Sequence, residues 1–422
     1  MHEILSFYLD NGLQVVMNSI PNINTVVASM WIKQGSKNET SNNNGISHIA
    51  EHMVVNKNNT KSRGLFEVFR QLQNNGVSFN ATTTKENTYY YFQGLKECLE
   101  TCLDALRLIV VTNRNFDLEL FENELRVVES EASSFYASFN QIKERTGQAL
   151  YGNYNVGRII LGSIDNIRST ALSDVEELIN RTYTPENSIL VVMGDINYEI
   201  DAKKIEERFA SWEDVETVSI EESIDNEPGI YFDGTFAGVN AVVSLGFRIP
   251  YSDEKERMCA ELLSLILSDP IMSERIPYEI RQKRGLAYNV GGFVSQYKKM
   301  CTLGIVCSST AQNIEEIIKI MLNEIIHARE NGITLDELNR AKMNLVTRRN
   351  IDFSEPMKRV LYLGKHSTYG RIYSFEDEVR KAKKTSLDFV NKTAGRFFCI
   401  ENMGLALIGK VDIERVVDIL VL

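Results

Sequence analysis

Two stretches of the chain, 215 positions apart (401 minus 186), share a pattern of apolar residues that runs into a glycine. They are residues 186–196 and 401–411, and each short, continuous apolar run predicts a buried strand followed by a turn. The same offset aligns the apolar run 26–33 with 241–248. A repeat of this length indicates a duplicated domain, because the units of repeat arrays are only ~20–50 residues long.

Between these strands the pattern predicts helices, including stretches at 95–110, 121–131 and 258–267. Residues 214–228 are instead acidic and lead into Pro228-Gly229, which is typical of an exposed linker. A chain of 422 residues also exceeds one ordinary hydrophobic core. We therefore expect two domains, 1–213 and 229–422, joined by the acidic linker 214–228.

The most specific chemical signal is the pentapeptide His48-Ile49-Ala50-Glu51-His52. On a helix, His48 and His52 lie four residues apart and share a face, so that both imidazoles can bind one metal ion. Glu51 lies beside that face, where its carboxylate can act on a water molecule. The chain has five histidines, and the presence of two in this motif makes chance a weak explanation. The pentapeptide predicts a hydrolytic zinc site.

A catalytic zinc site needs a third protein ligand and an open position. The predicted helix at 121–131 offers two pairs of carboxylates, Glu122 with Glu129 and Glu124 with Glu131. The members of each pair are seven residues apart, which is about two helical turns, so each pair shares a face. A solvated acidic helix has the same composition, and the composition alone does not choose between Glu129 and Glu131.

With this motif in place, the chain resembles the pitrilysin family of zinc metallopeptidases nearly end to end. Residues 76–82 (GVSFNAT), 86–90 (ENTYY) and 280–288 (IRQKRGLAY) are further points of resemblance. The match is to the smaller type, which includes bacterial processing proteases and subunits of the mitochondrial processing peptidase. In that family the third ligand is a glutamate 77 residues after the second histidine, which implies Glu129 (129 minus 52). The resemblance implies one Zn²⁺ per chain, Glu51 as general base, and Glu122 as a residue that supports the ligands.

The resemblance also implies a strand that binds substrate. Phe79, Asn80, Ala81 and Thr82 stand where the family's strand is most characteristic. A peptide substrate is expected to add to this strand as a further β-strand, so that main-chain hydrogen bonds supply affinity and side-chain pockets supply preference.

In the family, an Arg and a Tyr from the second half reach the zinc site. Arg281 and Tyr288 fit the family spacing of seven (288 minus 281), whereas Arg284 is only four residues from the tyrosine. Taken alone, this segment is an ordinary basic helix end followed by a glycine and a strand. One departure from the family is Pro270, which lies where its members have a glycine-rich turn.

The fold that the resemblance implies is α+β, with two homologous domains that face each other around a chamber. Each domain is expected to be an antiparallel sheet with helices on one face. The predicted helix at 258–267 has Leu262, Leu263, Leu265 and Ile266 where the first half has its motif. We therefore expect one metal site, in the first half.

Composition and charge exclude several other classes of protein. The net charge of −11 argues against a nucleic-acid-binding protein, which would carry a basic patch. No apolar run approaches the ~18 residues that a membrane span needs. The first residues lack the basic and apolar regions of a signal peptide, so the expected location is the cytoplasm.

These observations predict a zinc-dependent endopeptidase that hydrolyses peptides or unfolded segments, including a precursor or leader peptide. One alternative is the catalytic subunit of a heterodimer dedicated to the maturation of one ribosomally made peptide. Another is a non-catalytic scaffold or binding subunit. Such subunits typically lose part of the zinc motif or the Arg/Tyr pair, and this chain retains both. The expected partners are a peptide substrate and a second subunit, in a homodimer or a heterodimer with a related chain.

Overall fold

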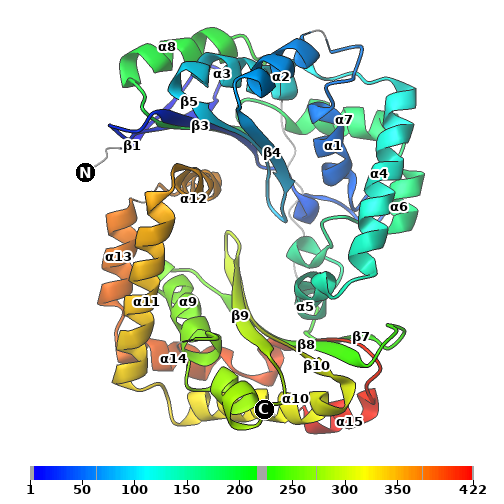
Figure 1. Ribbon diagram of the computed structural model, residues 1–422, viewed down its shortest axis with the longest axis vertical. Coiled ribbons are helices and arrows are strands. Elements are labelled where there is room, and N and C mark those ends of the chain that lie inside the picture. Colours follow the sequence, from blue (N-terminus) through cyan, green and yellow to red (C-terminus); the bar gives the residue numbers. More distant parts are fainter. Residues whose placement is uncertain (1–3, 63, 216–225, 272, 373, 421–422) are drawn as a thin grey trace. The chain divides into compact units, whose positions relative to one another are not determined.

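The computed structural model describes residues 4–62, 64–215, 226–271, 273–372 and 374–420. Residues 216–225, which form most of the predicted linker, and Met272 lie outside the described residues. The rest forms two compact units, each built around one sheet (Figure 1). Unit 1 falls within Met1–Ser133, Ile159–Glu222 and Ile351–Ser374, and unit 2 within Ser134–Arg158, Ser223–Asn350 and Phe375–Leu422.

The sheet of unit 1 has the order β1-β2-β6-β3-β5-β4. Its strands are β1 (Ile4–Tyr8), β2 (Gln14–Ser19), β3 (Thr25–Ile32), β4 (Ser78–Thr83), β5 (Thr88–Leu95) and β6 (Ser188–Gly194). β2 and β6 run parallel, and the other neighbours are antiparallel. β4 lies at the edge and pairs with β5 on its inner side only, in a register that sets Asn80 opposite Tyr91.

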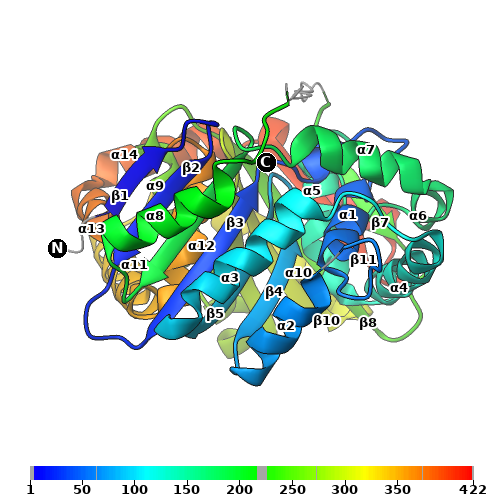
Figure 2. The ribbon, with the colours of Figure 1, turned by 90° about the horizontal axis from the view of Figure 1, so that it is seen from above.

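Helices α2, α3 and α8 cover one face of this sheet, and α4, α6 and α7 lie to one side of it (Figures 1 and 2). The helices of unit 1 are α1 (Ile46–Val55), α2 (Leu65–Asn74), α3 (Leu99–Arg107), α4 (Leu118–Tyr136), α6 (Ile164–Ser169), α7 (Leu172–Thr182), α8 (Tyr198–Phe209) and α12 (Pro356–Thr368). Among the described residues, α12 covers the opposite face through Val360 and Leu363.

The sheet of unit 2 has the order β7-β11-β8-β10-β9, with β11 parallel to β7 and the other neighbours antiparallel. Its strands are β7 (Ile230–Asp233), β8 (Asn240–Pro250), β9 (Asn289–Gln296), β10 (Met300–Thr310) and β11 (Met403–Ile408). The four strands β11, β8, β10 and β9 occur in the same order as β6, β3, β5 and β4 of unit 1. This correspondence confirms the predicted α+β fold with two homologous domains.

Helices cover both faces of the second sheet as well. They are α5 (Ile142–Tyr151), α9 (Glu254–Ser268), α10 (Ile314–Glu330), α11 (Leu335–Ser354), α13 (Phe375–Lys384), α14 (Leu387–Phe397) and α15 (Ile413–Ile419). Val242 and Ala406 pack with Ile142 of α5, whereas their neighbours Val243 and Leu405 belong to the main core with α9 and α10. Because successive strand residues point to opposite faces, α5 covers the face that α9 and α10 leave open.

Two helices are therefore exchanged between the halves of the sequence. α5 comes from the first half and packs in unit 2, and α12 comes from the second half and packs in unit 1. This differs from the expectation of helices on one face only. The reason is visible in β3 and β6, which are apolar at nearly every position and so must be buried on both faces. The boundary at 214–228 and the chamber stay predictions.

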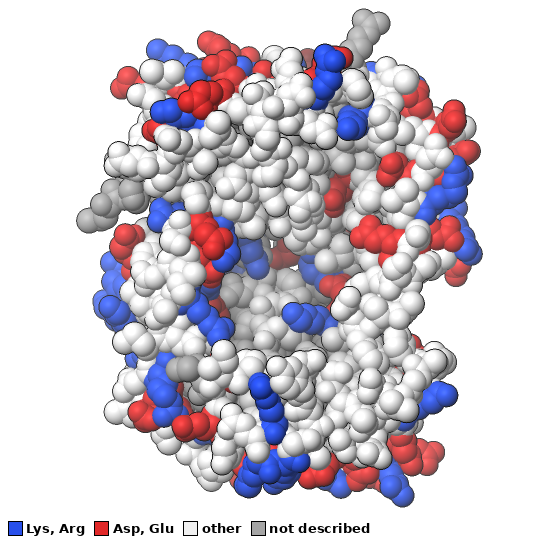
Figure 3. All heavy atoms as spheres, viewed as in Figure 1, with Lys and Arg blue, Asp and Glu red and all other residues white. Residues whose placement is uncertain are grey.

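Charged residues are distributed without a single dominant patch on the face shown in Figure 3, where acidic and basic groups are interspersed. The chain as a whole has 57 acidic and 46 basic residues. Within the described ranges, no helix combines the length and the apolar character needed to cross a bilayer.

Candidate metal centre

The helix that carries the histidines, α1, begins after Gly45, which has a φ of 105°. A side chain at Gly45 would be strained in this conformation and would also approach the carbonyl oxygen of Leu161 to 2.7 Å. The first turn is held by Glu39, a carboxylate only 1% exposed, which accepts hydrogen bonds from the amides of Gly45 and Ser47, each at 2.8 Å. A buried carboxylate on the free amides of a helix N-terminus fixes where the helix starts.

The imidazoles of His48 and His52 converge on one carboxylate. The Nε2 atoms of both lie 3.7 Å from Oε2 of Glu131, and the three possible ligand atoms lie within 4.8 Å of one another. Ligands bound at ~2.1 Å around a tetrahedral zinc ion would be ~3.4 Å apart, so the observed separations fit a shared ion with a small contraction. The donor set of two imidazoles and one carboxylate is that of known hydrolytic zinc sites.

The other nitrogen of His52 is held by a second glutamate. Nδ1 of His52 lies 3.1 Å from Oε2 of Glu124, and Asn56 donates to the other oxygen of Glu124 at 2.7 Å. An Nδ1–H that donates to Glu124 leaves the lone pair of Nε2 free for a metal. Glu124 thus orients a ligand, while both of its own oxygens are occupied.

The electrostatics of this cluster suit a bound cation. Burial, with a smaller contribution from His52, lowers the pKa of His48 to about 3, so this imidazole is neutral and able to ligate. Burial also acts to lower the pKa of His52, but Glu124, Glu51 and Glu131 outweigh it and raise the pKa above its usual value. The same carboxylates that favour a proton on His52 attract a divalent ion.

Glu51 is buried beside the histidines and is tied to the edge strand. Oγ1 of Thr83, the last residue of β4, donates to Oε2 of Glu51 at 2.5 Å. Burial raises the pKa of Glu51, and the hydrogen bond from Thr83 opposes this only in part. Because an ionised carboxylate can only accept hydrogen bonds, the single hydroxyl proton of Thr83 is the one shared with Glu51. A carboxylate with a raised pKa beside two possible metal ligands has the features of a general base.

Two of the predicted site residues do not lie with the histidines. Glu129 is paired with Arg168, at 3.0 Å from Nε and 2.5 Å from Nη2, and the side chain of Glu122 is exposed. Their places are taken two residues later on the same helix, by Glu131 near both histidines and by Glu124 on His52. We therefore replace Glu129 and Glu122 by Glu131 and Glu124.

The contacts of α4, and not its burial, distinguish the two pairs of glutamates. Its buried residues are Phe121, Val128 and Ala132. On a helix Glu129 and Glu131 lie about equally far to either side of this face, and the Glu131 side chain is 50% exposed against 30% for Glu129. Glu124 and Glu131 lie on the side that meets the histidines, whereas Glu129 meets Arg168. The sequence pattern alone therefore does not separate the two pairs.

The predicted substrate residues lie on β4 at the sheet edge. Asn80 is exposed, Ala81 and Thr82 are half-buried, and Phe79 stacks on Phe92 with ring centroids 4.7 Å apart. α1 packs against this strand, and Thr83 joins it to Glu51. An exposed backbone edge thus ends at the candidate general base.

The second-half pair, Arg281 and Tyr288, belongs to unit 2. Arg281 lies on η6 (Tyr278–Lys283), a π-helical turn, and its guanidinium lies 4.5 Å from the centroid of the Tyr288 ring. Arg284, the alternative in the sequence, is paired with Glu279. Arg281 and Tyr288 are therefore together, and their part in the reaction stays a prediction.

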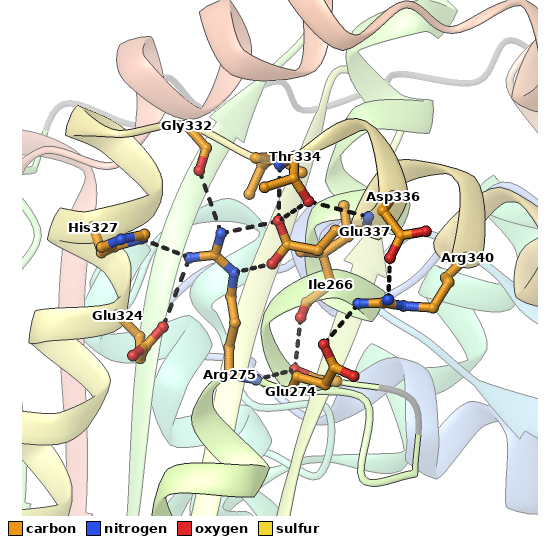
Figure 4. A network of polar contacts seen from close by, with 12 residues as sticks. Ile266, Glu274, Arg275, Glu324, His327, Gly332, Thr334, Asp336, Glu337 and Arg340 are labelled. Atoms are coloured by element: carbon orange, nitrogen blue, oxygen red, sulfur yellow. Dashed lines mark hydrogen bonds and ion pairs between the residues drawn. The ribbon is translucent and has the colours of Figure 1, made fainter.

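The segment that leads into η6 is anchored by Arg275 (Figure 4). This guanidinium is 7% exposed and donates to Glu337 through Nε at 2.6 Å and through Nη2 at 3.1 Å. It also contacts Nδ1 of His327 at 3.1 Å and the carbonyl of Gly332 at 3.3 Å. Burial alone would raise the pKa of Glu337, but Arg275 and Thr334 lower it to about 2. Arg275 thus fixes the chain six residues before Arg281 (281 minus 275).

Comparison with known families decides what kind of protein carries this site. Residues 14–163 match the family described as "Insulinase (Peptidase family M16)", and residues 171–345 match the "Peptidase M16 inactive domain". The chain belongs to peptidase family M16. The first match contains His48, Glu51, His52 and Glu131, and the second contains Arg281 and Tyr288. This confirms the family resemblance found in the sequence.

Relatives of this M16 chain carry the name of zinc proteases. An uncharacterized zinc protease of Bacillus subtilis, YmxG, is 27% identical over 96% of the chain and 98% of its own length. One from Rickettsia bellii is 27% identical over 92% of the chain and 94% of its own length. A crystal structure of a protease from Helicobacter pylori has a TM-score of 0.86 at 18% identity, covering 97% of this chain and all 100% of that one.

The description "inactive domain" agrees with the residues of α9. The repeat offset of 215 maps His48, Glu51 and His52 to Leu263, Ile266 and Leu267 (48, 51 and 52 plus 215). These three side chains are buried and apolar. Within the described part of the chain, the group of side chains that could hold a metal ion lies in unit 1.

Proposed function

We propose that this M16 chain is a zinc-dependent endopeptidase in which His48, His52 and Glu131 hold one Zn²⁺ ion. The observation that carries the proposal is the convergence of both Nε2 atoms on a single oxygen of Glu131. When bound, zinc supplies Lewis-acid chemistry that acidifies water and polarises a carbonyl group. The neutral state of His48 and the hydrogen bond from His52 to Glu124 support this ligand set.

Glu51 is the general base of the proposed reaction. Its carboxylate takes a proton from the attacking water and passes it to the leaving amine. Thr83 holds one of its oxygens, so the carboxylate cannot rotate freely. The raised pKa of Glu51 brings its proton affinity nearer to what a group that both accepts and donates needs.

The proposed substrate is a peptide or an unfolded segment that adds to the edge strand β4. Hydrogen bonds between the substrate backbone and the main chain of residues 79–82 would align the peptide without requiring one particular sequence. Since Thr83 at the end of this strand contacts Glu51, a peptide bound there passes the candidate base. Processing of a precursor or leader peptide is one use of such an activity.

The test is digestion of a mixed peptide library, followed by mass spectrometry. Wild type, Glu51→Gln and wild type with a chelator are compared, and zinc is added back to the chelated sample. We expect cleavage by wild type and by the zinc-restored sample only, with normal zinc content in Glu51→Gln. Glu51→Gln is isosteric, so it removes the base and keeps the fold.

Three outcomes would count against this function. Full cleavage by Glu51→Gln would remove Glu51 from the mechanism. Cleavage that survives chelation would remove the metal. A chain that binds one zinc ion and cleaves nothing in the library would favour the dedicated heterodimer, and an unlike chain should then co-purify with it.

A further inference from the structure

The edge strand β9 of unit 2 occupies the place that β4 occupies in unit 1. Both are the last strand of their sheet, and each pairs with the neighbouring strand of its own hairpin. In the described part of the chain, the outer backbone edge of β9 pairs with no strand. Such an edge can accept a peptide by strand addition.

A cavity of about 330 Å³ lies against this strand. Its wall includes Lys143 of α5, Arg281 of η6, Tyr288, and residues of β9 that include Gly291 and Phe293. All of these belong to unit 2. The volume is that of a few amino-acid side chains, and the site is open to solvent through the exposed Lys143, Arg281 and Tyr288.

The charge of this cavity is positive, in a chain of net charge −11. Its lining contains two cationic residues and no Asp or Glu. Neither Lys143 nor Arg281 has an ion pair with a described residue, whereas Lys283 and Arg284, close by in sequence, both pair with Glu279. Two cations without a carboxylate in one concave site mark a place for an anionic group.

Aromatic rings keep both cations at the cavity. Nζ of Lys143 lies 5.3 Å from the centroid of the Phe293 ring. The guanidinium of Arg281 lies 4.5 Å from the centroid of the Tyr288 ring. A cation over an aromatic face is held without being neutralised, so its charge stays available to a ligand. The planar guanidinium can bind a carboxylate with two hydrogen bonds, and the lysine adds a compact charge.

We propose that this cavity binds a peptide carboxylate, either a C-terminus or an Asp or Glu side chain, while the peptide backbone lies along β9. This inference rests on the proposed peptidase function and deepens it, because it names acidic or carboxylate-ended peptides as the preferred substrate class. Lys143 is then a residue that determines specificity and takes no part in the hydrolysis.

The test measures peptide binding without cleavage. The full-length, zinc-loaded Glu51→Gln protein is titrated with fluorescein-labelled decapeptides of one sequence in four forms: a free or amidated C-terminus, each with Glu or Gln at one internal position. Fluorescence anisotropy gives Kd for each form. Lys143→Met, Lys143→Arg and Lys299→Met are compared in this background, since Lys299 is an exposed lysine at the far end of the β9–β10 hairpin and does not line the cavity.

We expect Lys143→Met to weaken binding of carboxylate-bearing peptides about tenfold and to leave the amidated Gln peptide unchanged, because it removes a charge-assisted contact. Lys143→Arg should retain most of the affinity, and Lys299→Met all of it. The form whose affinity falls identifies the source of the carboxylate. Raised salt should reduce the difference between forms.

An equal effect of Lys143→Met on all four peptides, or no effect on any, would overturn the proposal. So would the absence of measurable binding by the carboxylate-bearing forms. Hydrolysis by wild type is measured separately. Carboxylate-dependent binding without zinc-dependent cleavage would support the cavity assignment and contradict the proposed function. Zinc-dependent cleavage without carboxylate-dependent binding would support the proposed function and contradict the cavity assignment.

Discussion

Helices α1 and α9 occupy related places beside two sheets that share the order of four strands, yet their side chains differ in kind. α1 buries His48 and Glu51, and residues from other elements hold this site: Glu39 binds the first amides of α1, Thr83 donates to Glu51, and Glu131 of α4 lies near both histidines. α9 presents Leu263, Ile266 and Leu267 to the core of unit 2. The comparison teaches that a chemical site in this fold requires supporting residues from several other elements, and that without them the same place is filled by core.

The largest loss of stability is expected when the two histidines of the motif are introduced into α9, which lacks the residues that surround them in α1. The double variant Leu263→His/Leu267→His places two imidazoles in the apolar core of unit 2, and both positions are fully buried. We expect the free energy of unfolding to fall by about 4 kcal/mol, through lost packing and buried polar groups. Urea denaturation measures this, with Leu263→Met as a control. A stable variant that binds a second zinc ion would break the comparison.

The next prediction tests which glutamate completes the site in unit 1. Glu131→Ala should lower zinc affinity by more than the ~10–100-fold typical of losing an outer partner, because it removes a ligand. Glu129→Ala removes an ion pair with Arg168 that is largely solvent-exposed, and should leave zinc affinity within about twofold. Competitive titration with a chromogenic chelator measures both. The reverse ranking would return Glu129 to the ligand set.

Glu124 provides a smaller and more specific test. Glu124→Ala should reduce zinc affinity about 10–100-fold, because Nδ1 of His52 loses the acceptor that orients its ring. Glu122→Ala, two residues earlier on the exposed side of α4, is the matched control and should behave as wild type. Equal zinc affinities in the two variants would show that the contact with Glu124 does not orient the ligand.

The smallest predicted effect is on turnover, and it concerns the hydrogen bond that holds Glu51, the proposed general base. Thr83→Val keeps the shape of the side chain but removes the hydrogen bond to Glu51, and should lower kcat about tenfold with little change in KM or zinc affinity. Thr83→Ser should restore the rate. Steady-state kinetics on a peptide identified in the library screen measure both. Unchanged turnover in Thr83→Val would mean that α1 alone positions Glu51.

Much of the scaffold was predictable from the sequence, because it depends on local patterns. The strand at 26–33, the helix at 258–267 and the strand at 79–82 that we propose binds substrate correspond to β3, α9 and β4. The histidine pair follows from helical spacing alone. These features depend on residues close together in the chain.

The choice between Glu129 and Glu131 depends instead on how two helices meet. Counting 77 residues from His52 assumes that the connection between α1 and α4 has the same length as in other family members. In this chain α4 turns Glu131 toward the histidines and Glu129 toward Arg168. The exchange of α5 and α12 is equally hidden, because periodicity predicts a buried face but not the sheet that buries it.

That exchange has a consequence for cutting the chain. A fragment that ends at residue 213 would keep the zinc motif but lose α12, whose Leu363 and Val360 cover Val27 and Trp31. The complementary fragment from residue 229 would lose α5, and with it the cover over Val242 and Ala406. Each fragment would expose an apolar sheet face and aggregate when produced alone. The two halves are homologous, yet we expect neither to fold independently, and co-expression should recover both in native form.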